Sequence, residues 1–285
     1  MKQRITMKTN TGIAALCGVM AMMVSGCASV QVPPGAAELG YTKCILNERP
    51  TVADITGEKT GNFKWFSGQW YNAKPPSLDH YVMIDGVLAL KLGGDLVSAP
   101  RDLKQAGALP LLPGKDGFYV EFDTWISAND PDHWPAVWLM PFEHNGRQED
   151  RLATDPKGFQ RFMELDVDEG GFGPGLTGTV HSSEGNWPKY KHVQNPNNVR
   201  KEPLDRSKKH TFGASYDPKS QTVTWWVDGV KQMSATAPYV PEIARQHRYY
   251  LIMSGQSHKL QKEHFTFISG VRAFVPAACE IPAAK

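Results

Sequence analysis

The chain has 285 residues, of which 41% are hydrophobic and 21% are charged. This composition is that of a globular protein large enough for one sizeable core. The formal net charge is +2, and the first 26 residues carry three basic side chains and no acidic ones. Subtracting those three charges leaves a net charge of −1, which gives no electrostatic reason to expect nucleic-acid binding.

The N-terminal segment, residues 1–26, is predicted to be a signal peptide. A basic start precedes the apolar run "GIAALCGVMAMMV", which is too short to span a membrane comfortably. The run ends in "VSGC", which resembles the lipobox of bacterial lipoproteins, so that Cys27 would carry lipid and begin the mature protein. Because Ala28 and Ser29 follow, with no Asp, the resemblance implies the outer membrane of a Gram-negative cell. The alternative is an ordinary signal peptide.

The rest of the chain is predicted to form a tether at 27–41, one domain at 42–276 and a C-terminal tail at 277–285. No repeat or break in composition divides the domain. Cys44 and Cys279 lie near its two ends, and outside the cytoplasm a disulfide between them is expected. The alternative is two buried thiols. No CxxC pair or histidine spacing indicates zinc.

Along the domain the local signals are almost entirely those of short strands. Two hairpins are predicted around Asp85-Gly86 and Asp228-Gly229, the two-residue turns that best fit twisted antiparallel strands. Further strands are expected at 118–127, 134–140, 176–183, 210–217, 248–255 and 264–275, and a single short helix near 241–245. Many short strands separated by turns indicate an all-β fold, most simply a two-sheet β-sandwich or jelly roll.

Two further stretches are interpreted as loops. "GPGLTG" (173–178) matches a nucleotide-binding glycine pattern in letters only, because it precedes a strand instead of opening a helix. The basic cluster "RKEPLDRSKKH" (200–210) contains acidic residues and is expected to be a solvated loop.

The segment "FMELDVDEGG" (162–171) places four carboxylates within six positions. Side chains alternate between faces along a strand, so Glu164, Asp166 and Asp168 would share one face and Glu169 would enter the core. An unpaired ion there costs several kcal/mol. A one-residue bulge after Val167 removes this conflict, because it brings Glu169 to the face of Glu164 and Asp166 and turns Asp168 away.

Two glutamates and an aspartate on one open face suit glycosidic bond cleavage. One carboxylate attacks the anomeric carbon and the other protonates the leaving oxygen, with about 5–5.5 Å between them in a retaining enzyme. An acidic calcium site and a solvated edge strand are the alternatives that the pattern leaves open.

The segment "ELDVDE" resembles the E-x-D-x-x-E signature of family-16 glycoside hydrolases, in the bulged form of bacterial laminarinases and lichenases. "HWPAVWLMP", "GTVHSS", "HTFGASYDPKSQTVTWWVDGV" and "FTFISGVRAFVP" resemble other strands of that family, in family order, and cover most of residues 80–276. The resemblance implies a concanavalin A-like jelly roll with a concave sugar-binding cleft. It also implies Glu164 as nucleophile, Glu169 as general acid/base, and Asp166 as the residue that orients Glu164.

The charge of ionised Glu164 is then expected to keep Glu169 protonated until it is needed as an acid. The candidate sugar-binding residues are Trp134, Trp138, His181, Trp187, Ser254 and Gln256. No cofactor is expected to be required. A structural calcium ion, common in the family, is possible but is not located by the sequence.

The expected partner is a polysaccharide, and a membrane only through the lipid anchor; a monomer is expected. The resemblance implies a retaining endo-hydrolase, most simply of a neutral β-1,3- or β-1,3/1,4-glucan. Because "IMSGQS" departs from the family at a cleft asparagine, a red-algal galactan, as for agarases, stays open. A transglycosylase and a non-catalytic carbohydrate-binding sandwich are the further alternatives.

Overall fold

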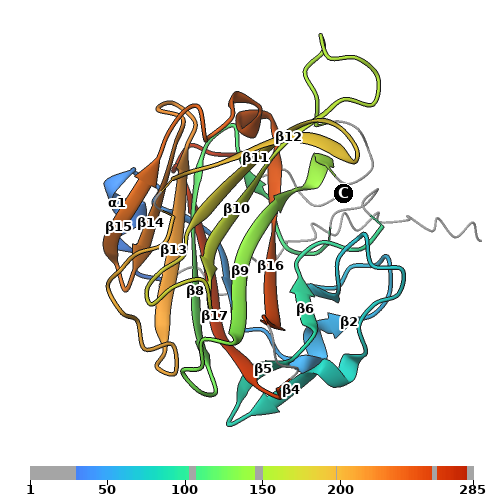
Figure 1. Cartoon of the computed structure of the whole chain (residues 1–285), viewed down its shortest axis with the longest axis vertical. Coiled ribbons are helices and arrows are strands. Elements are labelled where there is room, and N and C mark those ends of the chain that lie inside the picture. Colours follow the sequence, from blue (N-terminus) through green and yellow to red (C-terminus); the bar gives the residue numbers. More distant parts are fainter. Residues whose placement is uncertain (1–29, 103–106, 145–149, 197, 259–261, 281–285) are drawn as a thin grey trace, which may run out of the picture.

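The computed structural model describes residues 30–102, 107–144, 150–196, 198–258 and 262–280 (Figure 1). The predicted signal peptide and the predicted lipidation site Cys27 lie outside these residues, so both stay predictions. None of the helices among the described residues is long and apolar enough to cross a membrane.

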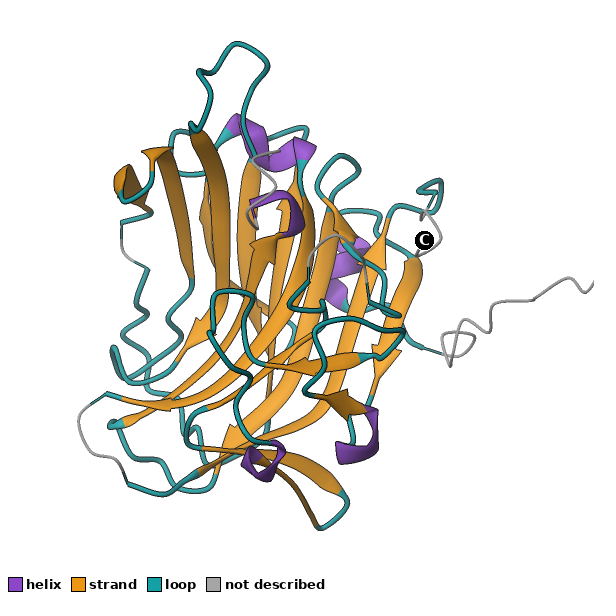
Figure 2. Cartoon of the chain, turned by 90° about the vertical axis from the view of Figure 1, so that its right-hand side faces the viewer, coloured by secondary structure: helices purple, strands orange, loops and turns teal. Residues whose placement is uncertain are grey.

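Two stacked sheets make up the described chain, with little helix beside them (Figure 2). We call the first the back sheet. Its eight strands run in the order β15 (Val230–Ala235), β14 (Thr222–Val227), β13 (His210–Asp217), β8 (Phe118–Ile126), β17 (Phe265–Val275), β5 (Val87–Lys91) and β4 (Tyr81–Ile84), with β1 (Lys43–Glu48) also paired to β17.

The second, or front, sheet has nine strands and carries the acidic segment. Its order is β12 (Lys189–Gln194), β11 (Thr179–Asn186), β10 (Gln160–Glu169), β9 (His133–Pro141), β16 (Arg248–Ser257), β6 (Gly94–Val97), β3 (Trp65–Ser67) and β2 (Ile55–Thr56), with β7 (Leu112–Pro113) paired to β16. The predicted all-β sandwich is therefore confirmed. In Figure 1 strands β11, β10, β9 and β16 lie side by side in front of β13, β8 and β17.

Both predicted hairpins are present, and their turns have the expected backbone. Asp85 and Gly86 join β4 to β5 with φ of 50° and 76°, and Asp228 and Gly229 join β14 to β15 with φ of 51° and 77°. Positive φ at both central residues matches the right-handed twist of the flanking strands. The short helix predicted near 241–245 is a 3₁₀ helix, η5 (Glu242–Gln246).

Three further 3₁₀ helices and one α-helix complete the described elements: η2 (Val52–Asp54), η3 (Leu78–His80), η4 (Phe142–His144) and α1 (Pro34–Glu38). The sequence reading missed α1 and strands β1, β2, β3, β6, β7 and β12. These strands are short or lie at sheet edges, where the apolar alternation is weak. "GPGLTG" is a loop before β11, as predicted.

The main core lies between the sheets and is built from alternate residues of facing strands. Val120 and Phe122 of β8 point inward from the back sheet, and Leu165 and Val167 of β10 point inward from the front sheet; all four are fully buried. Because side chains alternate along a strand, the two neighbours of Leu165 on β10, Glu164 and Asp166, face outward, away from the back sheet.

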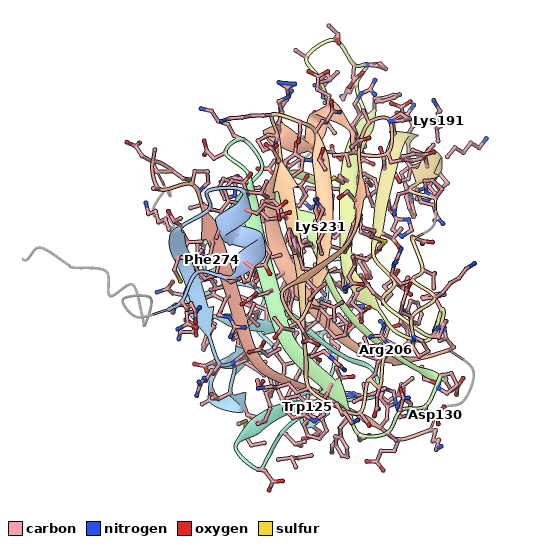
Figure 3. All side chains as sticks on the ribbon, turned by 90° about the vertical axis from the view of Figure 1, so that its left-hand side faces the viewer. Trp125, Asp130, Lys191, Arg206, Lys231 and Phe274 are labelled. Carbon is pink, nitrogen blue, oxygen red and sulfur yellow. The ribbon has the colours of Figure 1, made fainter. Side chains whose placement is uncertain are left out.

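Residues 30–41 do not form the predicted free tether. α1 lies across the outer face of the back sheet, near the labelled Phe274 in Figure 3, and Ala36 is fully buried there with Tyr119 and Trp226. Gly35 allows this close approach, because a Cβ at that position would lie 2.6 Å from the Tyr119 ring. The segment was mistaken for a tether because small residues, not large apolar ones, make the contact.

The predicted Cys44–Cys279 disulfide is wrong. Cys279 is a free, buried thiol whose Sγ lies 3.5 Å from the Asp116 carboxylate. Its backbone carbonyl accepts a hydrogen bond of 2.7 Å from Lys43. The start of the predicted C-terminal tail is therefore held against β1 by a polar contact, without a covalent bond to that strand.

Candidate active site

The acidic strand β10 contains the predicted bulge. Asp166 pairs with Trp138 of β9, and the next pairing joins Asp168 to Val137, so Val167 is the extra residue on β10. Val167 and Asp168 are both buried on the core side. Glu169 pairs with Ala136 and is only partly buried, because the shift returns it to the outer face. The register confirms that Glu164, Asp166 and Glu169 share that face.

The glycines after the strand allow this backbone to turn sharply. Gly171 has φ of 84°, in the left-handed region that favours glycine. A Cβ at Gly170 would lie 2.6 Å from the Pro135 ring, and the Gly170 N–H donates to the Pro135 carbonyl at 2.8 Å. The strand is thus locked to β9 immediately beyond Glu169.

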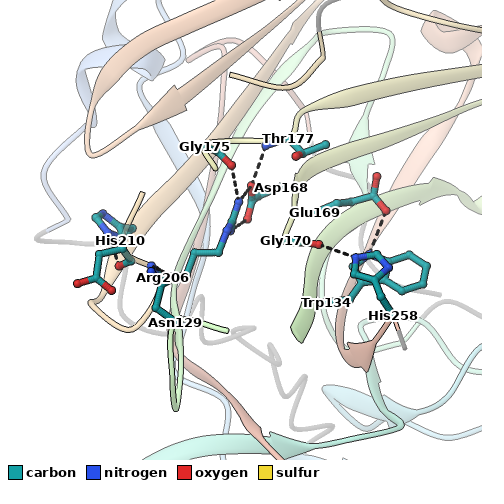
Figure 4. Close-up of polar contacts among 11 residues, drawn as sticks. Asn129, Trp134, Asp168, Glu169, Gly170, Gly175, Thr177, Arg206, His210 and His258 are labelled. Atoms are coloured by element: carbon teal, nitrogen blue, oxygen red, sulfur yellow. Dashed lines mark hydrogen bonds and ion pairs between the residues drawn. The ribbon is translucent and has the colours of Figure 1, made fainter. Parts of the chain in front are cut away.

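Glu169 is held beside an aromatic cluster. The Trp134 indole N–H donates to Glu169 Oε1 at 3.3 Å. His258 stacks flat on Trp134 with ring centroids 4.8 Å apart, and its Nε2 donates a hydrogen bond to the Gly170 carbonyl, 3.2 Å away (Figure 4). Phe172 meets both rings edge-on and is exposed. Because His258 covers one face of Trp134, a sugar could stack only on the other face.

His181 of β11 lies opposite Glu164 in the register and approaches the middle carboxylate, with its Nε2 3.1 Å from Asp166 Oδ2. Its other ring nitrogen shares a 3.2 Å hydrogen bond with His192 of β12. His192 in turn contacts the Ser183 hydroxyl at 3.2 Å. The predicted cleft histidine therefore sits at the carboxylates, and His192, which the sequence reading missed, stands behind it.

The three outward carboxyls are close enough to change each other's ionisation. Burial raises the pKa of Glu164 to about 8, and the neighbouring Asp166 charge adds to the rise. Burial and the charge of Glu169 raise the pKa of Asp166 well above its ordinary value. Burial also raises the pKa of Glu169, against the opposing effects of His181 and the Trp134 N–H. The cleft therefore holds at least one proton near neutral pH.

The position of that proton differs from the sequence argument. The charge of Glu164 was expected to keep Glu169 protonated, yet burial is the main cause of the raised pKa at both residues. With a pKa of about 8, Glu164 itself is protonated at neutral pH. It must lose this proton before it can act as a nucleophile.

Trp138 and Trp134 share one face of β9, as predicted, since they pair with Ile252 and Gln256 of β16. The Trp138 indole N–H donates to the Ser254 hydroxyl at 3.1 Å. Ser254 is 1% exposed. Its hydroxyl is therefore buried and holds the Trp138 indole in place, and it is not exposed for contact with a sugar. Trp138 also packs against a second apolar cluster that includes Ile252.

A further carboxylate lies on β6, which is separated from β10 by β9 and β16. Asp95 of β6 pairs directly with Ser254, so it lies on the same face as Trp138. Burial raises the pKa of Asp95, and hydrogen bonds from Ser254 and Gln256 oppose the rise. The sequence reading missed Asp95 because "GGDLVSAP" carries no pattern that indicates a cleft.

Two aromatic residues on loops are exposed near the front sheet. Tyr71, which the sequence reading missed, is 59% exposed. Partial burial of its hydroxyl, with the charges of Asp95 and Glu164, raises the pKa of Tyr71 to about 12. Trp187 is 76% exposed between β11 and β12 and contacts Tyr190, so its role in sugar binding stays a prediction.

Among the residues that the structure describes, Glu164, Asp166 and His181 form the one group able to share a metal ion, with ligand atoms within 4.8 Å of one another. This group coincides with the candidate catalytic residues. The structural calcium ion stays an unlocated prediction.

No family model and no curated protein matches the chain. Solved structures with a similar fold include a β-porphyranase from the human gut bacterium Bacteroides plebeius, with 16% identity and a TM-score of 0.51 over 81% of this chain and 94% of that one. A laminarinase from Rhodothermus marinus has 14% identity and a TM-score of 0.49, over 82% of this chain and 97% of that one. A κ-carrageenase from Pseudoalteromonas carrageenovora has 16% identity and a TM-score of 0.47, over 70% of this chain and 83% of that one. The porphyranase match shows that this chain has that enzyme's two-sheet fold.

Proposed function

We propose that the protein is a retaining endo-glycoside hydrolase of a neutral β-linked polysaccharide, most simply a β-1,3- or β-1,3/1,4-glucan. The observation that carries the proposal is the bulged strand β10, which sets Glu164, Asp166 and Glu169 on one outward face. The sequence resemblance to family-16 glycoside hydrolases and the fold shared with a porphyranase support it.

The roles follow from the chemistry of two carboxyl groups flanking one bond. The Glu164 carboxylate attacks the anomeric carbon, and the bond to the leaving sugar oxygen breaks as Glu169 donates its proton to that oxygen. Glu169 then removes a proton from water, and the resulting hydroxide equivalent displaces Glu164 from the anomeric carbon. Two displacements at one carbon retain its configuration. Asp166, between the two glutamates, orients Glu164 and shares its charge.

The preference for a neutral substrate is supported by the charge of this face. Asp95, Glu164, Asp166 and Glu169 all lie on it, and the basic group in contact with them is His181. A sulfated or uronic chain would bring additional negative charge against these carboxyls, at a cost that a low-dielectric cleft increases. A neutral sugar carries no such cost.

The substrate and the stereochemistry are tested in one experiment. Laminarin, lichenan, xyloglucan, agarose and carrageenan are digested separately, and NMR follows the first anomer formed. We expect activity on laminarin or lichenan with retention. Activity confined to agarose or carrageenan would overturn the substrate, and an inverted first product would overturn Glu164 as nucleophile.

Variants separate catalysis from binding. Glu164→Gln and Glu169→Gln should each lower kcat by several orders of magnitude with the fold intact, whereas Glu202→Gln, on an exposed loop, should not change it. Full activity of both variants would refute the two catalytic assignments, whereas a wild-type protein that binds these polysaccharides and cleaves none of them would leave a carbohydrate-binding module as the better description. Longer products in excess acceptor sugar would instead identify a transglycosylase.

A further inference from the structure

The residue behind the bulge is an arginine that the sequence reading assigned to a solvated loop. Arg206 is 7% exposed and donates to both carboxylate oxygens of Asp168, with Nη2 2.8 Å from Oδ1 (Figure 4). Asp168 is 2% exposed. Arg206 therefore neutralises the one carboxylate of the acidic segment that points to the core.

The same pair fixes the backbone around the bulge through Thr177. The Thr177 N–H donates to Asp168 Oδ1 at 3.2 Å, while the Thr177 carbonyl accepts the Glu169 N–H at 2.9 Å. Arg206 also donates to the Gly175 carbonyl at 3.0 Å. Successive residues of β10 are thus held by the same loop, one through its side chain and the next through its backbone.

Arg206 is itself held in place on both sides. Its N–H donates to the Asn129 side chain at 3.2 Å, and its carbonyl accepts the Ile126 N–H at 2.8 Å. The guanidinium lies over the Phe212 ring, 5.3 Å from its centroid. A group can position another only when its own geometry is fixed, and this condition is met.

We propose that Arg206 is a positioning residue for the general acid/base Glu169, acting through Asp168. By holding Asp168 on the core side, Arg206 keeps the bulge in place, and the bulge is what returns Glu169 to the cleft. This inference rests on the proposed glycosidase function. Arg206 acts through Asp168, so its loss should appear in the two steps that use Glu169, namely protonation of the leaving oxygen and deprotonation of the attacking water.

The test uses two substrates that differ in their need for an acid. A natural polysaccharide requires protonation of its leaving oxygen, whereas a dinitrophenyl β-glycoside of the same sugar releases a stable phenolate without it. Because general acid catalysis contributes about 10²–10⁴-fold, Arg206→Met should lower kcat on the polysaccharide by about 100-fold or more. On the aryl glycoside the glycosylation rate, measured as the burst of phenolate, should fall less than about tenfold, and KM should fall because the glycosyl-enzyme accumulates when Glu169 activates water poorly.

Three comparisons complete the design. Glu169→Gln should show the same selective loss, and Arg206→Lys, which keeps one charged donor, should recover part of the polysaccharide activity. Arg161→Met is the matched control, because Arg161 makes ion pairs at the other end of β10, and it should affect both substrates equally and weakly. Circular dichroism of each variant verifies its fold.

The outcomes distinguish the two proposals. Wild-type protein that cleaves neither substrate would refute the hydrolase function. Active wild type with an Arg206→Met variant that loses both substrates equally, or keeps both, would refute the role of Arg206 alone. If Arg206→Met does not fold, the same comparison with Arg206→Lys decides the matter.

Discussion

Glu164→Gln should stabilise the protein while it abolishes activity, and the gain should depend on pH. Burial and Asp166 raise the pKa of Glu164 from an ordinary value of 4.5 to about 8 in the folded state. Below pH 4.5 the group is protonated in both states and contributes nothing unfavourable. As the pH rises toward 8, the unfolded chain gains an ionised carboxylate that the folded cleft resists, so stability falls.

The size of this effect follows from the two pKa values. One pH unit corresponds to about 1.4 kcal/mol. Between pH 4.5 and pH 7 the raised pKa of Glu164 therefore lowers the free energy of unfolding by roughly 3 kcal/mol. Glutamine has the same shape and no charge. The free energy of unfolding of Glu164→Gln should therefore exceed that of the wild type by roughly 3 kcal/mol more at pH 7 than at pH 4.

Urea denaturation of both proteins at pH 4, 5.5 and 7 measures this difference, with Glu202→Gln as the exposed control. A difference between wild type and Glu164→Gln that stays constant with pH would refute the reasoning. The same raised pKa predicts that kcat/KM rises with pH toward a midpoint near 8, because attack requires ionised Glu164. A fully active enzyme at pH 5 would contradict it.

Three further changes test other parts of the fold. Gly35→Ala should lower the free energy of unfolding by about 1–3 kcal/mol in urea titrations, because its Cβ meets the Tyr119 ring at 2.6 Å; unchanged stability would argue against packing of α1. Cys279, with a thiol pKa raised to about 11 by burial and by Asp116, should be labelled by thiol reagents only after unfolding, as read by peptide mass spectrometry. Cys27→Ser should release the protein from the membrane fraction, and a variant that stays there would exclude Cys27 as the anchor.

The bulge could be predicted because the sequence poses a physical conflict that has one simple solution. Plain alternation would bury Glu169 in the core, and Gly170 and Gly171 follow where the chain must turn. The register of Asp166 and Asp168 against β9 confirms the solution. The hairpin turns were predictable for a similar reason, because few residues other than Asp and Gly adopt positive φ at low cost.

Arg206 could not be predicted, because a single buried arginine in a mixed-charge loop has no periodicity. Its partner Asp168 is 38 residues away, and only the folded chain brings them together. Asp95 and His258 were missed for the same reason, since each reaches the cleft from a strand or loop that carries no motif. The disulfide prediction was wrong because the position of a cysteine near a chain end does not show which group it meets, and Cys279 is a free thiol that faces Asp116.

The packing of residues 30–41 places α1 on the side of the molecule opposite the candidate active site. α1 covers the outer face of the back sheet, whereas Glu164 and Glu169 lie on the outer face of the front sheet, with the whole core between them. Val30, the first described residue, packs against the same cluster as α1. The described chain therefore begins on the side of the molecule opposite the candidate catalytic carboxylates, so this end of the described chain does not occupy the face on which a polymer substrate would bind.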